Sequence, residues 1–343
     1  MASSGVEIGP LTPAESEEFA NLALQYIGRD YDDIDESFAK NIIAAHFNGS
    51  DPIGYFTLAK RIWVAKRDGE HLGFLVATEK RGGSVKLGPH IVKEPFRSKG
   101  IGLRLRAFAT DHYRTSGARK LYAHGPISRL DMLRWDVLSG YQIEAQLRAQ
   151  YRTARDDFVV GRILRSLKPM PPLREQLSHA VPVPKAEHRL MTGAALMGFN
   201  TFLMKELSYW YDQIDQDFVE AVLNARERIQ EGFRAKGKAI FVSEASGVVV
   251  AAAIATFKRG GALKISPLIA RAGIPETVIG GLLETVASWA RIQKVRKLYT
   301  IHPLLDSRVV HAFQLAGYHA EGLIRSPYRD GVDCVAMGMF PQE

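Results

Sequence analysis

The chain has 343 residues, a formal net charge of +8 and 46% hydrophobic residues, a length that suits two domains, each able to bury its own core. Its single cysteine, Cys334, excludes a disulfide framework and cysteine-based zinc sites, and it favours a reducing, cytoplasmic setting. No basic head precedes an apolar run at the start, and the longest apolar stretch, 248–255, is too short to cross a bilayer, so we expect neither a signal peptide nor a membrane partner.

Hydrophobic spacing predicts the elements of the first half in chain order. They are helices over 14–27 and 35–48, strands over 61–65, 72–79 and 84–92, a helix over 101–115, a strand over 120–124, a helix over 128–138, and strands around 141–150 and 156–164. The helix over 101–115 is the clearest, because Ile101, Leu105 and Ala109 recur on one face and Gly117 follows. The order predicts a mixed sheet with helices packed on it, an α/β or α+β architecture.

The sequence repeats itself once, over about half its length. Lys80–Pro89 returns as Lys258–Pro267, and Leu138–Tyr141 returns as Leu315–Tyr318. The separation is 178 positions for the first pair and 177 for the second, so the matches are collinear. The chain therefore reads as two copies of one domain.

A proline-rich segment lies between the two copies. Proline continues neither a helix nor a central strand, and a proline-rich linker is extended and fairly stiff. We therefore predict a first domain over 1–166, a linker over 167–186 and a second domain over 187–343.

Two closely spaced glycines, Gly100 and Gly102, stand between a predicted strand and a predicted helix. They let the backbone turn sharply and allow a ligand to approach. Free amides at the start of a helix form an anion site, to which Arg97 and Lys99 add positive charge. This geometry suits a pyrophosphate. A dinucleotide fingerprint would need a third glycine where Leu105 stands, and no P-loop string occurs.

The string Arg97-Ser98-Lys99-Gly100-Ile101-Gly102, after Val92 on the strand, resembles the Arg/Gln-x-x-Gly-x-Gly/Ala signature of the GNAT superfamily of acyl-CoA-dependent N-acyltransferases. The resemblance implies two tandem GNAT-like domains, each a mixed, mostly antiparallel sheet flanked by helices. It also implies that the loop cradles the pyrophosphate of acetyl-CoA, or of another acyl-CoA, as co-substrate, without a metal. The residues implied to bind it are Ile91, Val92, Arg97, Ser98, Lys99, Gly100, Ile101, Gly102 and Leu103.

The second copy departs from this signature. Arg97–Gly102 faces Pro275–Gly280, which places the carboxylate of Glu276 where phosphates would lie. We therefore expect a degenerate second half that does not bind acyl-CoA in the family's manner. An alignment shifted by two, in which Gly273 or Gly281 takes the role, is the alternative.

The resemblance further implies that an amine attacks the thioester directly in a ternary complex. The backbone N–H of Val92 is then the candidate donor to the oxyanion. The tyrosine that many members use as general acid falls at Trp135 and Asp136, so Tyr151 or Tyr141 is the expected substitute.

For the general base we expect His124 at the end of its strand, with His90 and Glu94 as alternatives. Strand-end histidines and loop carboxylates also have ordinary structural roles. Asp32, Asp33 and Asp35 either bind a cationic acceptor or start a helix, and their recurrence at Tyr211–Asp215 favours the helix start.

Eight basic residues lie between Lys93 and Lys120, and a phosphorylated cofactor explains them without nucleic acid. We predict a cytoplasmic N-acyltransferase, with acetyl as the first choice of acyl group, that acts on a small-molecule amine and has no nucleic-acid partner. The sequence is also compatible with a homodimer. A protein or peptide N-acetyltransferase, and a non-catalytic acyl-CoA-binding or scaffold protein, stay open as alternatives.

Overall fold

The computed structural model describes residues 5–32, 34–49, 56–169, 185–192, 198–231 and 236–341. The chain divides into two compact units: unit 1 comprises Met1–Gln142 and Val159–Leu167, and unit 2 comprises Ile143–Phe158 and Lys168–Glu343. Residues 143–158, which the sequence repeat assigns to the first copy, thus belong to unit 2. Most of the expected linker, 170–184, lies outside the described residues.

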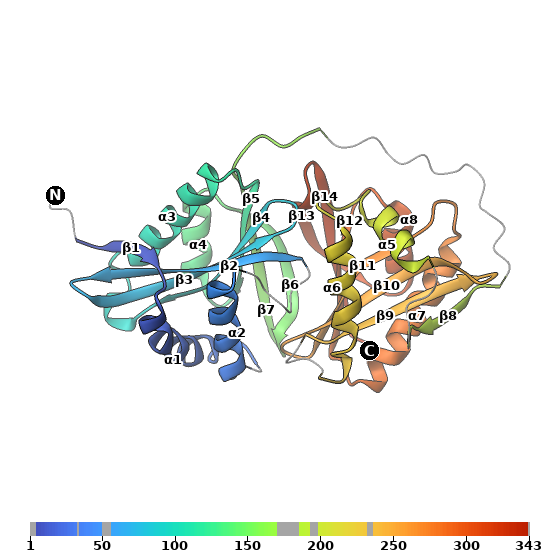
Figure 1. Cartoon of the computed structure of the whole chain (residues 1–343), viewed down its shortest axis with the longest axis horizontal. Helices are drawn as coiled ribbons and strands as arrows, with labels where there is room; N and C mark the ends of the chain where they lie inside the picture. The colour runs from blue at the N-terminus through green and yellow to red at the C-terminus, as the bar shows by residue number, and fades with distance from the viewer. Residues whose placement is uncertain are drawn as a thin grey trace. The chain divides into compact units, whose positions relative to one another are not determined.

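Unit 1 is a sheet with helices on both faces (Figure 1). Its elements are β1 (Glu7–Pro10), α1 (Ser16–Ile27), α2 (Glu36–Phe47), β2 (Thr57–Arg67), β3 (Glu70–Lys80), β4 (Ser84–Val92), α3 (Ile101–Thr115), β5 (Lys120–Pro126) and α4 (Leu130–Leu138), and the end of β7 (Arg155–Ile163) joins them. Neighbours from β1 to β4 pair antiparallel, and β4 and β5 pair parallel.

One face of this sheet carries the core under α1 and α2. Its apolar side chains include Phe19, Ile42, Phe74 and Ile91. Successive strand residues point to opposite faces, and accordingly His90, next to Ile91, lies against α3 on the other face. The alternation along β4 therefore sends Ile91 into the core and turns His90 and Val92 toward α3.

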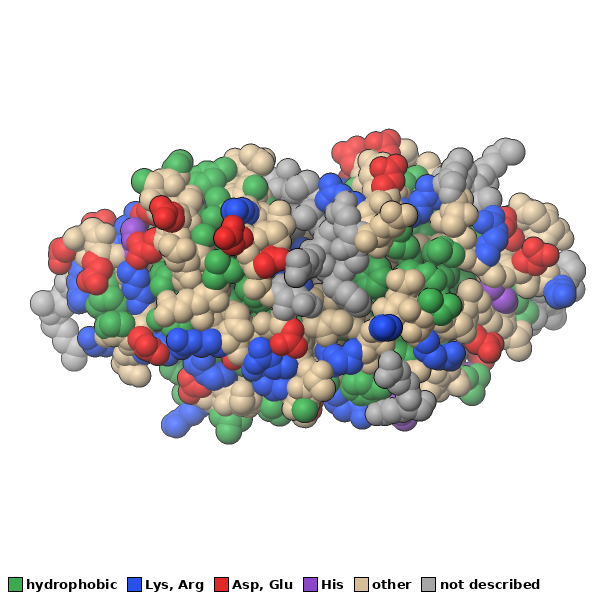
Figure 2. Space-filling model, turned by 90° about the horizontal axis from the view of Figure 1, so that it is seen from below, with side chains coloured by type: hydrophobic (Ala, Val, Ile, Leu, Met, Phe, Trp, Pro, Cys, Tyr) green, Lys and Arg blue, Asp and Glu red, His purple; other side chains and the backbone are tan. Residues whose placement is uncertain are grey.

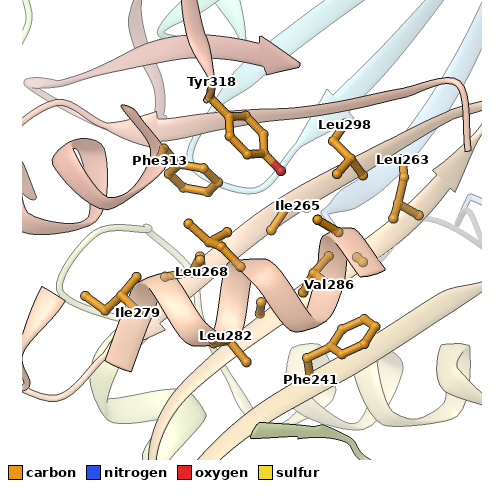
Figure 3. Close-up of a cluster of buried hydrophobic side chains, with 14 of the residues drawn as sticks. Phe241, Leu263, Ile265, Leu268, Ile279, Leu282, Val286, Leu298, Phe313 and Tyr318 are labelled. Carbon is orange, nitrogen blue, oxygen red and sulfur yellow. The ribbon is translucent and has the colours of Figure 1, made fainter. Parts of the chain in front are cut away.

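The strands of unit 2 follow one another in the order β6-β13-β14-β12-β11-β10-β9-β8. Its elements are β6 (Gln142–Arg152), β8 (Glu187–Leu190), α5 (Phe199–Leu207), α6 (Gln216–Arg226), β9 (Lys238–Ala245), β10 (Val248–Lys258), β11 (Ala262–Ala270), α7 (Glu276–Ile292), β12 (Lys297–Pro303), α8 (Ser307–Leu315), β13 (His319–Arg329) and β14 (Val332–Met339), together with the start of β7. Figure 3 shows its core, where Leu282 and Val286 of α7 lie among Phe241, Ile265 and Phe313.

The prediction of a mixed, mostly antiparallel sheet flanked by helices is confirmed. The observed strands are longer than predicted: β2 and β3 extend to Arg67 and Lys80 because polar residues at their ends still pair across the hairpin. The edge strand β1 was not predicted, because four residues are too few to show an alternating pattern. None of the helices in the described parts of the chain is long and apolar enough to cross a membrane.

Candidate active site

In unit 1 the strands β4 and β5 separate before they end. Their pairing runs from Ser84 and Lys120 to Leu87 and Ala123, yet β4 continues to Val92 and β5 to Pro126. At Gly88-Pro89 the register of β4 against β3 shifts, which marks a bulge. Beyond it, Gly88, Pro89, His90 and Val92 are all partly exposed. The carboxyl end of β4 is thus a strand edge that its neighbour β5 no longer covers.

The backbone of Val92 faces this uncovered side. The N–H of Lys93 donates to the carbonyl of Leu72 on β3 at 3.0 Å, so by the alternation of an antiparallel ladder the N–H and C=O of Val92 point away from β3. The carbonyl of Val92 instead accepts a 3.2 Å hydrogen bond from Nε of Arg97. The Val92 N–H therefore projects to the side where β5 has diverged.

Two glycines shape the loop between β4 and α3, for different reasons. Gly100 precedes the helix with φ of +78°, in the left-handed region that favours glycine. A Cβ on Gly102 would lie 3.2 Å from Cε1 of His90, so this residue allows α3 to approach β4 closely. Among the described residues no side chain caps the first turn of α3. Its leading amides are therefore available to an anion.

Of the other residues expected to bind the cofactor, some are exposed and some are buried. Ser98, Lys99 and Leu103 are exposed at the loop and the first turn of α3. Ile91 and Ile101 are buried core residues, so only their backbones are available to a ligand.

Arg97 turns toward α1 instead of toward the helix amides. Its guanidinium lies 4.9 Å from the ring centroid of Tyr26 and 3.4 Å from the carboxylate of Glu94. Arg29 lies 3.9 Å from the same carboxylate, which is 62% exposed. The Glu94 side chain thus stands in a solvated ion-pair cluster, and this arrangement favours an electrostatic role over proton transfer.

The basic residues between Lys93 and Lys120 do not all face a ligand, which corrects the prediction that a cofactor explains the whole cluster. Lys120 and Arg106 are buried, and Arg106 forms an ion pair with the buried carboxylate of Asp136 on α4. The same guanidinium lies 4.4 Å from the ring centroid of Tyr141. Asp136, which stands where a catalytic tyrosine was expected, is therefore the counter-ion of Arg106.

Figure 2 shows that basic and acidic side chains are interspersed on one face of the surface.

His90 lies between β4 and α3 with its Nε2 buried and without a hydrogen-bond partner among the residues that the structure describes. Burial, helped by the nearby charge of Arg106, lowers its pKa to about 3. A group with this pKa is a weak base at neutral pH. The structure therefore disfavours His90 as the base and leaves His124, partly exposed on β5 just past the last paired residue, as the better placed histidine.

The tyrosines expected as general acids and the aspartates before α2 lie in different parts of the structure. Tyr141 is buried, and in the described structure its hydroxyl has no hydrogen-bond partner. Tyr151 lies on β6 within the segment that belongs to unit 2. Asp35 caps α2 by accepting from the N–H of Phe38 at 3.2 Å, as Asp215 does for Phe218 in the second copy, so the predicted helix start is confirmed. Asp33 lies outside the described residues.

The corresponding connection in unit 2 is shorter. Residues 271–275 join β11 to α7, where residues 93–100 join β4 to α3. The strand ends, Val92 and Ala270, are 178 positions apart, whereas the helix ends, Thr115 and Ile292, are 177 apart. The structure therefore corrects the alignment by one residue in the helix, so that Ile279 corresponds to Gly102.

The alternative glycines of the second copy are accounted for otherwise. A Cβ on Gly281 would lie 2.4 Å from Nε2 of His188 on β8, so this glycine makes room for a side chain of the same unit. Gly273 forms the turn before α7 with φ of +79°. The carboxylate of Glu276 at the start of α7 lies 2.7 Å from Nδ1 of His311.

In unit 2 the two parallel strands also separate, because β11 pairs with β12 from Ala262 to Lys264 and continues to Ala270, but the residues beyond this point differ from those of unit 1. Ser266 takes the position of Gly88, and its hydroxyl donates to the carbonyl of Ile301 on β12 at 3.5 Å. Every residue of β11 after Lys264 is buried. Beyond its paired residues β11 is thus buried and carries Ser266, whereas most of the equivalent part of β4 is partly exposed and carries Gly88.

Residues 29–132 match the model of the acetyltransferase (GNAT) family. The chain therefore contains a GNAT acetyltransferase domain, which spans the loop and the uncovered end of β4. The match concerns residues of unit 1.

Similar solved structures each align with about half of the chain. A GNAT-family protein from Desulfovibrio desulfuricans is 18% identical and covers 47% of this chain and 100% of its own, with a TM-score of 0.41. Ard1 from Thermoplasma volcanium is 17% identical, covering 47% and 99%, with a TM-score of 0.39. A GNAT acetyltransferase from Staphylococcus aureus Mu50 is 14% identical, covering 47% and 100%, also with a TM-score of 0.39. No curated protein matches the chain.

Proposed function

We propose that unit 1 is an acyl-CoA-dependent N-acyltransferase that transfers an acetyl group from acetyl-CoA to the amine of a small molecule. One observation carries the proposal: the uncovered end of β4 is joined to the uncapped amides of α3 by a loop with the left-handed residue Gly100, and Gly102 lets α3 approach β4 closely. We further propose that the second copy is a degenerate domain of the same kind, because its connection is shorter and the residues of β11 beyond its paired segment are buried.

In this proposal the first amides of α3 and the side chain of Lys99 bind the pyrophosphate. The thioester lies along the end of β4, and the Val92 N–H stabilises the oxyanion as the amine attacks the carbonyl carbon. His124 takes the proton of the amine, directly or through water. The C–S bond then breaks and the thiolate leaves. A thiolate needs little help from an acid, which is compatible with Asp136 standing in place of a tyrosine.

The cellular compartment is part of the same proposal. The single cysteine, Cys334, is buried and free, which supports a reducing compartment such as the cytoplasm.

A second candidate function is a non-catalytic acyl-CoA-binding protein. The position of Asp136 favours it, since the carboxylate of Asp136 is paired with Arg106 and does not offer a proton.

A titration followed by an activity assay tests the proposal. We expect the full chain to bind acetyl-CoA at one site by calorimetry and to release thiol when mixed with a panel of small amines. Binding without thiol release across small amines and peptides would support the non-catalytic candidate, release with peptides alone would support a protein acceptor, and no heat of binding would refute the whole proposal.

The role of His124 has its own test. We expect His124→Ala to bind acetyl-CoA as the natural chain does but to turn over at least about tenfold more slowly, because general base catalysis contributes at least this much. An unchanged pH profile of kcat would remove His124 as the base.

A further inference from the structure

Arg97 connects three parts of unit 1 around the end of β4. Its Nε donates to the carbonyl of Val92 at 3.2 Å. Its guanidinium lies 4.9 Å from the ring centroid of Tyr26 on α1 and 3.4 Å from the carboxylate of Glu94 in the loop. A guanidinium combines directed N–H groups, a charge and a flat face, and Arg97 uses all three here. We call these three contacts the brace.

The hydrogen bond from Arg97 fixes the peptide that joins Val92 to Lys93. The N–H of this peptide donates to the carbonyl of Leu72 on β3 at 3.0 Å, and its carbonyl accepts from Arg97. Pairing between β4 and β5 ends at Leu87, so the carbonyl of Val92 lies beyond the paired segment. A backbone carbonyl at a strand edge needs an acceptor's partner from elsewhere. Arg97 thus takes the place of a partner strand.

Helix α1 supplies further fixed points for the loop. The phenol oxygen of Tyr26 accepts a hydrogen bond from the N–H of Glu94 at 3.3 Å, while its ring faces Arg97. Lys93 forms an ion pair with Glu18 near the start of the same helix. The first part of the loop is therefore attached to α1 at Lys93, Glu94 and Arg97.

The connection in unit 2 contains an arginine with the same kind of contacts. Nε of Arg271 donates to the carbonyl of Val249 on β10 at 2.8 Å, and its guanidinium lies 5.4 Å from the ring centroid of Phe202 on α5. Ile279 stands there in the position of Gly102. An arginine thus attaches the connection to the sheet and to a helix even where the glycine of the loop is lost, which favours a structural task over phosphate binding.

We propose that Arg97 is a positioning residue that braces the end of β4 and the first part of the loop, rather than a ligand of the pyrophosphate. This inference rests on the function proposed for unit 1, since the brace keeps the Val92 N–H and the first amides of α3 in the relative positions that an acyl-CoA needs. The opposite model is an Arg97 that leaves Tyr26 and binds the phosphates through its charge.

Two substitutions separate a directed N–H from a positive charge. In glutamine the amide nitrogen is bonded to Cδ, as Nε is in arginine, so Arg97→Gln keeps a donor within reach of the Val92 carbonyl and removes the charge. In Arg97→Lys a methylene group takes the place of Nε while the charge stays. A brace predicts that glutamine substitutes better than lysine, and a phosphate ligand predicts the reverse.

Hydrogen exchange of the full-length chain without added ligand tests the brace independently of any activity. We expect the amides of Glu94 and Arg97, which are hydrogen-bonded, to exchange about tenfold faster in Arg97→Lys, because the loop opens more readily, and to be little changed in Arg97→Gln. Mass spectrometry of peptides that cover 92–100 measures this. Arg114→Ala is the matched control, since Arg114 forms an exposed pair with Asp111 three residues away, as Arg97 does with Glu94.

Binding and turnover give the second test. By calorimetry we expect Arg97→Lys to bind acetyl-CoA about tenfold more weakly than the natural chain, and Arg97→Gln to bind it within about threefold. With S-acetyl-pantetheine, a thioester that carries no pyrophosphate, kcat should fall in the same order. A loss of kcat with this donor cannot come from a lost phosphate contact.

Equal exchange of the loop in Arg97→Lys and in the natural chain would overturn the brace. Tighter binding of acetyl-CoA by Arg97→Lys than by Arg97→Gln would show instead that Arg97 binds the phosphates through its charge. A natural chain that binds no acetyl-CoA would refute the function proposed for unit 1, and the exchange rates would still decide whether Arg97 braces the loop.

Discussion

The seam between α3 and α4 in unit 1 and the seam between α7 and α8 in unit 2 occupy equivalent positions but differ in chemistry. Unit 1 buries the ion pair of Arg106 and Asp136 against Tyr141. At a spacing of 177, unit 2 has Leu283, Phe313 and Tyr318 in these places, with the rings of Phe313 and Tyr318 4.9 Å apart. Figure 3 shows Phe313 and Tyr318 within an apolar cluster. The same fold thus tolerates either a buried ion pair or hydrophobic packing at this seam.

The ends of β4 and β11, which lie beside these seams, also differ between the two units. In unit 1 Gly88 leaves open space, since a Cβ there would meet no atom within 4 Å. In unit 2 Ser266 bridges the two strands. A polar seam and a glycine at the end of the strand thus accompany the glycine loop in unit 1, and an apolar seam and a serine accompany its loss in unit 2.

The largest expected effect comes from removing one partner of the buried pair. We expect Asp136→Ala to lower the free energy of unfolding by about 3–5 kcal/mol, because it leaves the charge of Arg106 buried and uncompensated. Urea denaturation measures this. The double substitution Arg106→Leu with Asp136→Phe, which copies unit 2, should be close to neutral or stabilising. A double variant as unstable as the single one would contradict the comparison.

The next effect concerns the loop. We expect Gly100→Glu to weaken binding of acetyl-CoA at least about 100-fold, because the substitution strains a residue at φ of +78° and places a carboxylate where the pyrophosphate would bind. Calorimetric titration measures it. Pro275→Ala at the start of α7 is the matched control and should leave binding unchanged. Equal losses from the two variants would refute a single site in unit 1.

A smaller effect is expected at the strand edge. Gly88→Ser introduces the residue of unit 2 and adds a side chain to the open edge of β4, at a φ of +138° that also strains any residue other than glycine, so we expect kcat/KM for acetyl transfer to fall about tenfold. The reciprocal change, Ser266→Gly in unit 2, should leave kcat/KM unaltered. An effect of Ser266→Gly as large as that of Gly88→Ser would show that the edge in unit 2 also takes part.

The smallest expected effect is a pH dependence that originates in unit 1. The pKa of His90 is about 3 in the fold and near 6.5 when unfolded, so unfolding takes up a proton between these values. Stability should therefore fall as the pH drops below 6.5, by up to about 1.4 kcal/mol per pH unit. The slope between pH 6.5 and 5.5 should be reduced in His90→Leu.

The carboxyl of Glu15 affects stability over a lower pH range than His90 does. Desolvation raises its pKa, but hydrogen bonds from Lys66, Thr12 and His71 outweigh this and lower it to about 2. Its contribution to stability should be present above pH 4.5 and lost below. An unchanged slope above pH 5.5 in His90→Leu would show that His90 does not titrate as its burial requires.

The sequence predicted the elements and the loop because these depend on local rules. Apolar spacing located α1, α2 and α3, and two glycines between a strand and a helix located the loop before α3. Asp35 and Asp215 were recognised as helix starts because a capping carboxylate acts on its own helix. The one clue left unused was Arg106, a charged residue next to the apolar positions of α3, which could have been read as a buried ion-pair partner.

Local rules did not reveal which side chains meet across elements. The pairing of Arg106 with Asp136, the turn of Arg97 toward Tyr26 and the bridge from Ser266 to β12 join residues that are distant in sequence. The placement of 143–158 in unit 2 is of the same kind. The sequence by itself thus determined the secondary structure, the repeat and the glycine loop, since these follow from backbone conformation and periodicity. Only the tertiary structure decided which residues at the strand ends are exposed and which are buried, because burial and long-range contacts arise only when the strands and helices pack.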